Sequence, residues 1–420
     1  MAAEFSLSIY PWVYLSKFDG DAWVPEYVEK RHLSPAGEEA LPDAERERLY
    51  RERNEFPGLP LVNYTTQYAM ACFEGLKAFP QPDGSLKLFR PRENAIRMKR
   101  SMEGLYMPGV PVDEFVQAAR GVVARNQTIG FAPAYEPAWE RDDFDSGHSV
   151  YIRPFSLAEG GIGVNLSQAP WFVVISTRVG SYFSEGTSAT ITTRRVRATP
   201  GGTGWIKCSA NYVTSALAKR EAEVAGYLEC VFLDAEHHRY VEEGSSCNLF
   251  FVLGDGRLVT PALGDTILPG ITRRTILELA AEEGMTVEER PLAVEEVLDD
   301  AVEAFGTGTA AGVTFFSSLR HGDSEKVFGD GAIGPVAHGF LKTLKGVQYG
   351  ALEDRHGWMV PVTDDAADGG ASGAGETAAG ADADTGADGA LVGGAGGAER
   401  ANGTDAERQG AGSAARAVSG

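Results

Sequence analysis

The feature that most constrains the fold is an alternation of helix-like and strand-like segments through residues 1–362, followed by a sharp change in composition. Residues 112–126 place apolar side chains at helical spacing, whereas residues 149–157 are rich in the β-branched and aromatic residues typical of a strand. The segment 271–283 follows a Leu-Pro-Gly sequence and is closed by Gly284, as expected for a helix. The chain is therefore predicted to be an α+β protein.

Two domains are expected in this part of the chain, because it is longer than one typical domain. A loop of turn residues at 178–187, between two strand-like segments, is the predicted interdomain linker. It separates an N-terminal α/β domain, residues 1–177, from a C-terminal domain, residues 188–362, which carries most of the motifs described below. We expect the active site at the interface of the two domains, where ligand pockets commonly form.

The segment 363–420 is acidic and rich in glycine and alanine, with no aromatic residue and almost no large aliphatic one. Such a segment cannot bury enough apolar surface to offset its chain entropy, so we expect a disordered tail. The whole chain has a formal net charge of -21. This charge argues against a nucleic acid or an anionic membrane as a partner, because either would require a basic face.

The four cysteines form no C-x-x-C pair, and they are too few in a chain of 420 residues to make a disulfide framework. The N-terminus lacks the pattern of a signal peptide. No apolar run approaches the roughly 20 residues that span a bilayer. We therefore expect a soluble, cytoplasmic protein with free thiols.

One lysine stands among apolar and small residues in the sequence TGWIKCSANY. Taken alone, Lys207 would be interpreted as a surface charge. Three further features favour a function for it. Glu243 lies at a turn of small residues, the sequence LPGIT opens a helix with free amides at Ile271 and Thr272, and residues 306–312 form a loop of small and hydroxyl residues.

An amine, a carboxylate and a phosphate cradle are the three requirements of pyridoxal 5'-phosphate. The amine forms a Schiff base, the carboxylate balances the pyridine nitrogen, and the cradle anchors the phosphate. Each feature alone is common in proteins that bind no cofactor. Their joint occurrence in this order favours a pyridoxal-phosphate enzyme, and no metal site is expected.

Eight motifs in the same order resemble those of the branched-chain amino acid aminotransferases, which are fold-type IV pyridoxal-phosphate enzymes. They span about residues 60–362 and are YAMACFEGLKAF, LFRPRENAIRMKRS, VYIRPF, GGIGVN, KCSANY, EEGSSCNLFF, LPGITR and GTGTAAG. The resemblance implies reversible transamination of leucine, isoleucine and valine with 2-oxoglutarate. The products would be branched-chain 2-oxo acids and L-glutamate.

The resemblance also implies roles for individual residues. Lys207 would form the Schiff base and move the proton during catalysis. Tyr212 would hydrogen-bond the phenolic oxygen of the cofactor, and Glu243 would pair with its pyridine nitrogen. The residues implied to hold the phosphate are Arg97, Ile271, Thr272 and Thr309.

The residues implied to line the substrate pocket are Tyr68, Phe73, Tyr151, Arg153, Val164 and Ala310. Tyr151 and Arg153 would lie on one wall, because side chains two residues apart on a strand point to the same face. Ala310 would offer a backbone amide to the substrate carboxylate. Val164 lies in a segment that crosses to the partner subunit in this family, which implies a homodimer with shared active sites.

Two kinds of alternative stay open at this point. A D-amino acid aminotransferase or an aminodeoxychorismate lyase of the same fold would share the lysine and the phosphate features, although FEGLKAF and YIRP favour the branched-chain type. A non-catalytic binding protein would have a decayed site, whereas Lys207, Tyr212, Glu243 and Arg97 are all present.

Overall fold

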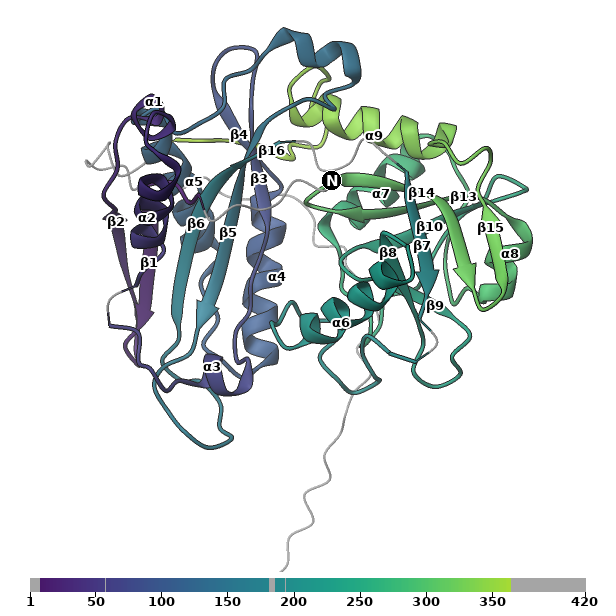
Figure 1. Cartoon of the computed structure of the whole chain (residues 1–420), viewed down its shortest axis with the longest axis horizontal. Coiled ribbons are helices and arrows are strands. Elements are labelled where there is room, and N and C mark those ends of the chain that lie inside the picture. Colours follow the sequence, from purple (N-terminus) through teal and green to yellow (C-terminus); the bar gives the residue numbers. More distant parts are fainter. Residues whose placement is uncertain (1–7, 57, 181–185, 193, 364–420) are drawn as a thin grey trace, which may run out of the picture. The chain divides into compact units, whose positions relative to one another are not determined.

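The computed structural model describes residues 8–56, 58–180, 186–192 and 194–363. Within these ranges the chain contains two β-sheets, and helices that pack against them (Figure 1). The predicted α+β class is confirmed. The predicted disordered tail lies outside the described residues, apart from Thr363.

The first sheet has seven strands in the order β16-β4-β3-β5-β6-β1-β2, and every neighbouring pair is antiparallel. Its strands are β1 (Trp12–Phe18), β2 (Trp23–Glu29), β3 (Leu76–Pro80), β4 (Leu86–Phe89), β5 (Ser149–Leu157), β6 (Trp171–Val179) and β16 (Met359–Pro361). The edge strand β16 comes from the end of the described chain. The chain therefore returns to the first sheet after it has passed through all the strands of the second.

Helices α4 (Pro91–Gly104) and α5 (Val112–Thr128) pack on this sheet and supply much of its core. Buried α4 residues such as Met98 and Met102 have helical spacing, and α5 buries Phe115, Ala119 and Val122 in the same way. The remaining helices of this half are α1 (Pro35–Glu39), α2 (Asp43–Arg53), α3 (Tyr64–Tyr68) and the 3₁₀ helix η1 (Pro137–Asp142). This core therefore holds α4 against the strands of the first sheet.

In the second sheet, six strands close into a barrel in the order β7-β8-β9-β10-β13-β14. The strands of this sheet are β7 (Thr187–Ile191), β8 (Glu229–Leu233), β9 (Val241–Gly244), β10 (Asn248–Leu253), β11 (Leu258–Thr260), β12 (Val287–Glu289), β13 (Ala301–Gly308), β14 (Gly312–His321) and β15 (Ser324–Val327). The barrel closes between β9 and β10 through the single pair Glu243 and Asn248. A candidate site residue therefore lies at the closure point.

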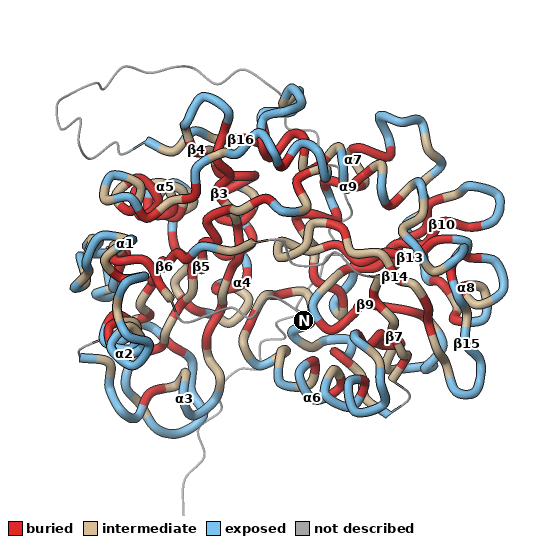
Figure 2. The backbone as a smooth tube through the Cα atoms, turned by 45° about the horizontal axis from the view of Figure 1, so that its top comes forward, coloured by how far each residue is buried: buried red, intermediate tan, exposed pale blue. Residues whose placement is uncertain are grey.

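The helices of this half are α6 (Asn211–Val224), α7 (Ile271–Glu282), α8 (Val294–Asp300) and α9 (Pro335–Gln348). One core cluster joins Phe250 and Phe305 of the barrel with Phe79 and Phe89 of the first sheet. Figure 2 shows the buried residues following the strands of both sheets. The two halves therefore share part of their apolar core.

Several predicted elements agree with the structure, including β5 and the helix at 271–283, which ends at Glu282. The sequence of residues 188–196 predicts a strand over its whole length, but β7 ends at Ile191. Beyond the end of β7, the amide of Arg195 donates to Oγ1 of Thr192 at 3.3 Å and not to a neighbouring strand. Among the helices of the described ranges, none is both long and apolar enough to cross a membrane.

Candidate active site

A cavity of about 240 Å³ is lined by residues of both sheets and of helices α4, α6 and α7. It receives Phe73, Tyr151 and Arg153 from the first half of the chain, and Lys207 and Glu243 from the second. All the predicted site residues except Tyr68 and Val164 line it. The fold thus brings residues that are far apart in the sequence to one place.

Lys207 is held by backbone hydrogen bonds to the first half of the chain. Its amide donates to Oγ of Ser101 on α4 at 3.0 Å, and its carbonyl oxygen accepts from the amide of Phe73 at 3.1 Å. An isolated antiparallel bridge between Cys72 and Cys208 lies beside these contacts. Lys207 is consequently fixed at the base of the cavity, although its sequence neighbours are in a loop.

The side chain of Lys207 points into the cavity and not into bulk solvent. Its Nζ donates to the phenolic oxygen of Tyr212 at 2.7 Å and lies 4.9 Å from the ring centroid of Phe73. Tyr212 lies in the first turn of α6, five residues after the lysine. The first turn of α6 thereby places the Tyr212 hydroxyl next to Nζ of Lys207.

Glu243 is buried beside this pair and has several hydrogen-bond donors around it. The amide of Leu268 and Nδ2 of Asn248 donate to its Oε1, the latter at 3.5 Å. Nε of Arg197 lies 3.2 Å from its Oε2. Burial raises the pKa of the Glu243 carboxyl to about 7, and the opposing effects of Arg197, the Leu268 amide and Lys207 hold it from rising further.

Arg197 was not among the predicted site residues. It is 8% exposed, and its Nη1 donates to the carbonyl oxygens of Gly204 at 3.2 Å and Thr266 at 2.6 Å. These contacts hold its guanidinium beside Glu243. The segment that contains it has several arginines, and no local pattern separates Arg197 from a surface residue.

The N-terminus of α7 and Arg97 meet at another part of the cavity. Helix α7 begins at Ile271, and its N-cap residue Gly270 has no side chain to bind the first amides. Arg97 lies on α4, and its Nη1 donates to the carbonyl oxygen of Pro269 at 3.0 Å. A helix N-terminus beside a guanidinium is an arrangement that binds phosphate.

Glu74 forms an ion pair with Arg97 that the sequence analysis did not anticipate. Nε and Nη2 of the arginine lie 2.7 and 2.8 Å from the two carboxylate oxygens. Both side chains are buried. The pair fixes the orientation of the guanidinium and partly neutralises its charge, so the uncapped amides of α7 matter more for an anion.

The wall formed by β5 bears Tyr151 and Arg153 on one face, as their spacing predicts. The phenolic oxygen of Tyr151 accepts from Nη2 of Arg153 at 2.7 Å, and the guanidinium lies 4.9 Å from the ring centroid of Phe73. A Cβ atom at Gly75 would overlap the Tyr151 hydroxyl, so a larger residue there would displace the Tyr151 side chain. Within the described ranges, no carboxylate forms an ion pair with Arg153.

The hairpin turn between β13 and β14 contributes Thr309 and Ala310. Oγ1 of Thr309 donates to the carbonyl oxygen of Gly75 at 3.0 Å, and Nζ of Lys77 donates to that of Ala310 at 2.6 Å. Burial, with a smaller effect of the Lys345 charge, lowers the pKa of Lys77 to about 7. The first half of the chain thus holds the turn by two hydrogen bonds.

Tyr68 and Val164 lie together, but away from the cavity lining. The amide of Gly163 donates to the hydroxyl of Tyr68 at 3.1 Å, which joins the loop of Val164 to α3. Val164 is 91% exposed, its neighbour Ile162 is 81% exposed, and Leu61 is 92% exposed. These exposed apolar side chains lie in the two segments joined by the hydrogen bond from the Gly161 amide to the Val62 carbonyl oxygen.

The site fits the chemistry of pyridoxal 5'-phosphate, because an amine, a phenol, a carboxylate and an uncapped helix N-terminus converge on one cavity. Oγ1 of Thr307, also in the lining, is buried and has no protein partner among the described residues. No cluster of metal-binding side chains occurs in the described part of the chain.

Comparisons with known proteins agree with this geometry. The family described as amino-transferase class IV matches residues 71–319. The branched-chain-amino-acid aminotransferase of Mycolicibacterium smegmatis is 40% identical over 304 residues, which cover 70% of this chain and 80% of that protein.

Solved structures give the same result. The holo form of the Thermobaculum terrenum branched-chain amino acid aminotransferase, which contains pyridoxal phosphate, has a TM-score of 0.64 at 27% identity, covering 85% of this chain and 99% of that one. The branched-chain amino acid aminotransferase of Escherichia coli has a TM-score of 0.63 at 30% identity, covering 73% of this chain and 95% of that one. The resemblance found in the sequence is confirmed.

Proposed function

The chain belongs to the class IV aminotransferase family, within it to the branched-chain amino acid aminotransferases, and we propose that the cavity around Lys207 is its active site. The protein is a branched-chain-amino-acid transaminase that uses pyridoxal 5'-phosphate. The single observation that carries the assignment of the site is the 2.7 Å contact of Lys207 with Tyr212, in a cavity that also contains Glu243.

Lys207 is the amine that attaches to the cofactor and the base that moves the substrate proton. When bound, pyridoxal 5'-phosphate supplies a carbonyl carbon for amines and a ring that accepts electrons from the substrate Cα. The Tyr212 hydroxyl orients the amine through the contact at 2.7 Å. The Phe73 ring packs on the Tyr212 ring, with centroids 4.7 Å apart, and lies 4.9 Å from Nζ, so it shields the amine from water.

Glu243 would supply the negative charge that balances the pyridine nitrogen of the bound cofactor. This role requires an ionised carboxylate, whereas burial favours the protonated form. Arg197 and the amide of Leu268 offset the effect of burial and hold the two carboxylate oxygens. We therefore assign to Arg197 the role of keeping Glu243 ionised and oriented.

The first amides of α7, at Ile271 and Thr272, hold the phosphate together with Arg97 and Thr309. The absence of a side-chain cap on α7 supports this assignment, because the amides have no competing partner from Gly270. Arg97 contributes a guanidinium that Glu74 keeps in place. The phosphate would anchor the cofactor while the attachment at Lys207 changes.

The substrate wall consists of Phe73, Tyr151 and Arg153, with the Ala310 amide directed at the substrate carboxylate. The aromatic rings suit a branched aliphatic side chain. Arg153, which has no acidic partner among the described residues, suits the second carboxylate of glutamate. One pocket can thus accept both partners of the reaction, which are branched-chain L-amino acids and 2-oxoglutarate.

A homodimer with shared active sites is part of the proposal. The exposed apolar side chains of Leu61, Ile162 and Val164 support it, since patches of this kind mark interaction surfaces. Tyr68 and Val164 would then complete the pocket of the partner subunit. We also propose a cytoplasmic location, and a domain division at 178–187, with β16 returning to the first sheet at the end of the second domain.

An assay with two amino donors tests the function. With 2-oxoglutarate as acceptor, L-leucine should be converted to its 2-oxo acid while D-alanine should not react. A D-amino acid aminotransferase would give the opposite result. An aminodeoxychorismate lyase would convert neither donor, and conversion of neither donor would overturn the proposal.

A further inference from the structure

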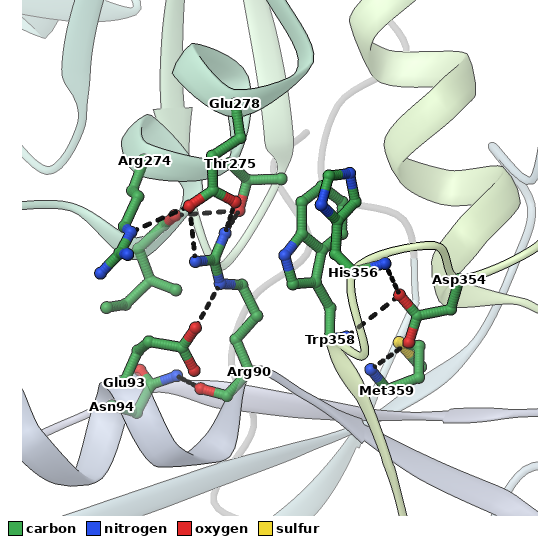
Figure 3. Close-up of polar contacts among 11 residues, drawn as sticks. Arg90, Glu93, Asn94, Arg274, Thr275, Glu278, Asp354, His356, Trp358 and Met359 are labelled. Carbon is green, nitrogen blue, oxygen red and sulfur yellow. Dashed lines mark hydrogen bonds and ion pairs between the residues drawn. The ribbon is translucent and has the colours of Figure 1, made fainter. Parts of the chain in front are cut away.

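Arg90 is a buried arginine outside the cavity, and it joins the two helices that carry the proposed phosphate site. It lies between β4 and α4 with φ at +48°, a left-handed conformation that is uncommon for a residue other than glycine. Only 3% of the residue is exposed. Figure 3 shows its side chain extending from the start of α4 to α7.

Each nitrogen of the Arg90 guanidinium has a partner. Nη1 and Nη2 bind the two carboxylate oxygens of Glu278 at 2.7 and 3.0 Å, which is a bidentate pair between α4 and α7. Nη1 also donates to Oγ1 of Thr275 at 3.0 Å, and Nε to Oε1 of Glu93 at 2.8 Å. Burial works against the charge of Glu278, but Arg90 and, to a smaller extent, Arg274 together outweigh that effect and keep the pKa of this carboxyl below its ordinary value.

A second hydrogen bond extends this contact to the first residue of α7. Oγ1 of Thr275 accepts from Arg90 and donates to the carbonyl oxygen of Ile271 at 3.0 Å. Ile271 is one of the residues whose amides form the proposed phosphate site. Arg90 is thus two hydrogen bonds away from the N-terminus of α7.

Arg90 is the N-cap residue of α4, and Arg97 lies inside the helix seven residues later. The first contacts α7 at Glu278, and the second contacts the carbonyl oxygen of Pro269, just before α7 begins. Helix α4 therefore holds α7 at two points, one on each side of its first turn. The relative position of the Arg97 guanidinium and the α7 amides depends on both points.

Helix α7 has a further ion pair, with the loop that precedes β16. Glu282, four residues after Glu278, pairs with Nε2 of His356 at 2.7 Å. The His356 ring is stacked on Trp358, whose centroid lies 5.2 Å from the Arg90 guanidinium (Figure 3). The carboxylate of Asp354 fixes this loop by accepting from the amides of Trp358 and Met359.

The apolar contacts of α7 are on a different face and do not involve Arg90. Ile276 and Leu279 are buried with Phe250 and Phe305 of the barrel. These contacts should keep α7 folded and docked when the bonds to Arg90 are lost. Apolar packing is less directional than a bidentate ion pair, so the helix could then shift along its axis.

We propose that Arg90 is a positioning residue for the cofactor phosphate: it fixes the N-terminus of α7 relative to Arg97 through Glu278 and Thr275. The inference rests on the proposed function, since it assumes that Ile271, Thr272 and Arg97 bind the phosphate. It adds a residue that touches neither cofactor nor substrate. Arg90 is not a catalytic residue.

The test compares two ligands of the cofactor-free protein, pyridoxal 5'-phosphate and pyridoxal, which has the same ring and aldehyde but no phosphate. Arg90→Met should weaken binding of the phosphorylated ligand by about ten-fold or more, as measured by the absorbance change on binding. Binding of pyridoxal should change by less than about two-fold. Inorganic phosphate should also compete less well against pyridoxal 5'-phosphate in the variant.

Arg274→Met is the matched control. Arg274 also binds Glu278, at 2.9 Å, but it is exposed and forms no hydrogen bond or ion pair with α4 in the described part of the chain. This variant should leave both dissociation constants unchanged. Equal weakening of both ligands by Arg90→Met, or no weakening of either, would overturn the inference.

Glu278→Gln provides a second variant in case Arg90→Met does not fold. It keeps the shape of the side chain and one acceptor for Arg90, so the same selective loss should appear at a smaller size. Equal affinities of the two ligands for the unaltered protein would instead contradict the proposed phosphate site. That result would be distinct from a failure of the role of Arg90.

Discussion

Nε of Arg197 lies 3.2 Å from Oε2 of Glu243, and both side chains are 4% exposed. A buried carboxylate without a cation would be protonated near neutral pH, because burial alone raises its pKa. The arginine opposes this effect, and two backbone carbonyl oxygens hold it in place. The ionisation of Glu243 thus depends on Arg197, which lies 46 positions earlier in the chain (243 minus 197).

Arg197→Met should move the acid limb of the pH profile of kcat/KM to higher pH. Arg197 lowers the pKa of Glu243, so its removal raises that pKa further above about 7 and the ionised form is reached only at higher pH. Activity near neutral pH should fall by about ten-fold or more. Arg194→Met, which removes an exposed arginine paired with Glu221, serves as the control. An acid limb at the same pH in all three proteins would contradict the role of Arg197.

Glu243→Gln should slow catalysis while the cofactor stays bound. A charge-assisted contact contributes roughly 1.5 to 3 kcal/mol, so the rate should fall about ten- to a hundred-fold. Steady-state rates with L-leucine at saturating cofactor would measure this effect. An unchanged turnover number would show that another carboxylate faces the pyridine nitrogen.

Glu243→Gln should also change how the stability of the cofactor-free protein depends on pH. The pKa of Glu243 is raised from 4.5 to about 7 on folding, so its contribution to stability is fully present below pH 4.5 and is lost as the pH rises through about 7. Gln does not titrate. The stability of the variant relative to the unaltered protein should therefore increase over this range in urea unfolding experiments, and a constant difference would contradict the raised pKa.

Lys207→Ala should give a folded protein without transaminase activity. The change removes the amine that attaches to the cofactor and moves the substrate proton. A melting temperature near that of the unaltered protein would show that the fold is intact. Lys219→Ala, which removes another lysine of the cavity lining, should keep most of the activity. Transamination at a near-normal rate by the Lys207 variant would refute the assignment of the site.

Arg153→Met should separate the two amino donors. Leucine and glutamate occupy one pocket, but only glutamate brings a second carboxylate, which is costly to bury without a cation. The half-reaction with L-glutamate should slow by at least about ten-fold, whereas that with L-leucine should lose little. Single-turnover changes in cofactor absorbance report each half-reaction separately. Equal losses would mean that Arg153 supports the wall as a whole.

Local sequence patterns were sufficient to predict much of the secondary structure and to identify the family. The strand at 149–157 and the helix at 271–283 agree with β5 and α7, because β-branched runs and helix start and stop signals depend only on neighbouring residues. The motifs around Lys207 and Glu243 indicated pyridoxal-phosphate chemistry for the same reason. The cofactor and the reaction were therefore accessible from the sequence.

The arrangement around those motifs depends on contacts between distant segments, which no local pattern encodes. Only the tertiary structure closes the barrel at Glu243, joins β16 to the first sheet, and places Arg197, Glu74 and Arg90 beside their partners. A buried arginine and a surface arginine have the same sequence signature, because burial is set by what packs on them. The sequence motifs determined the chemistry of the site, whereas long-range packing determined which charged side chains lie beside the motif residues.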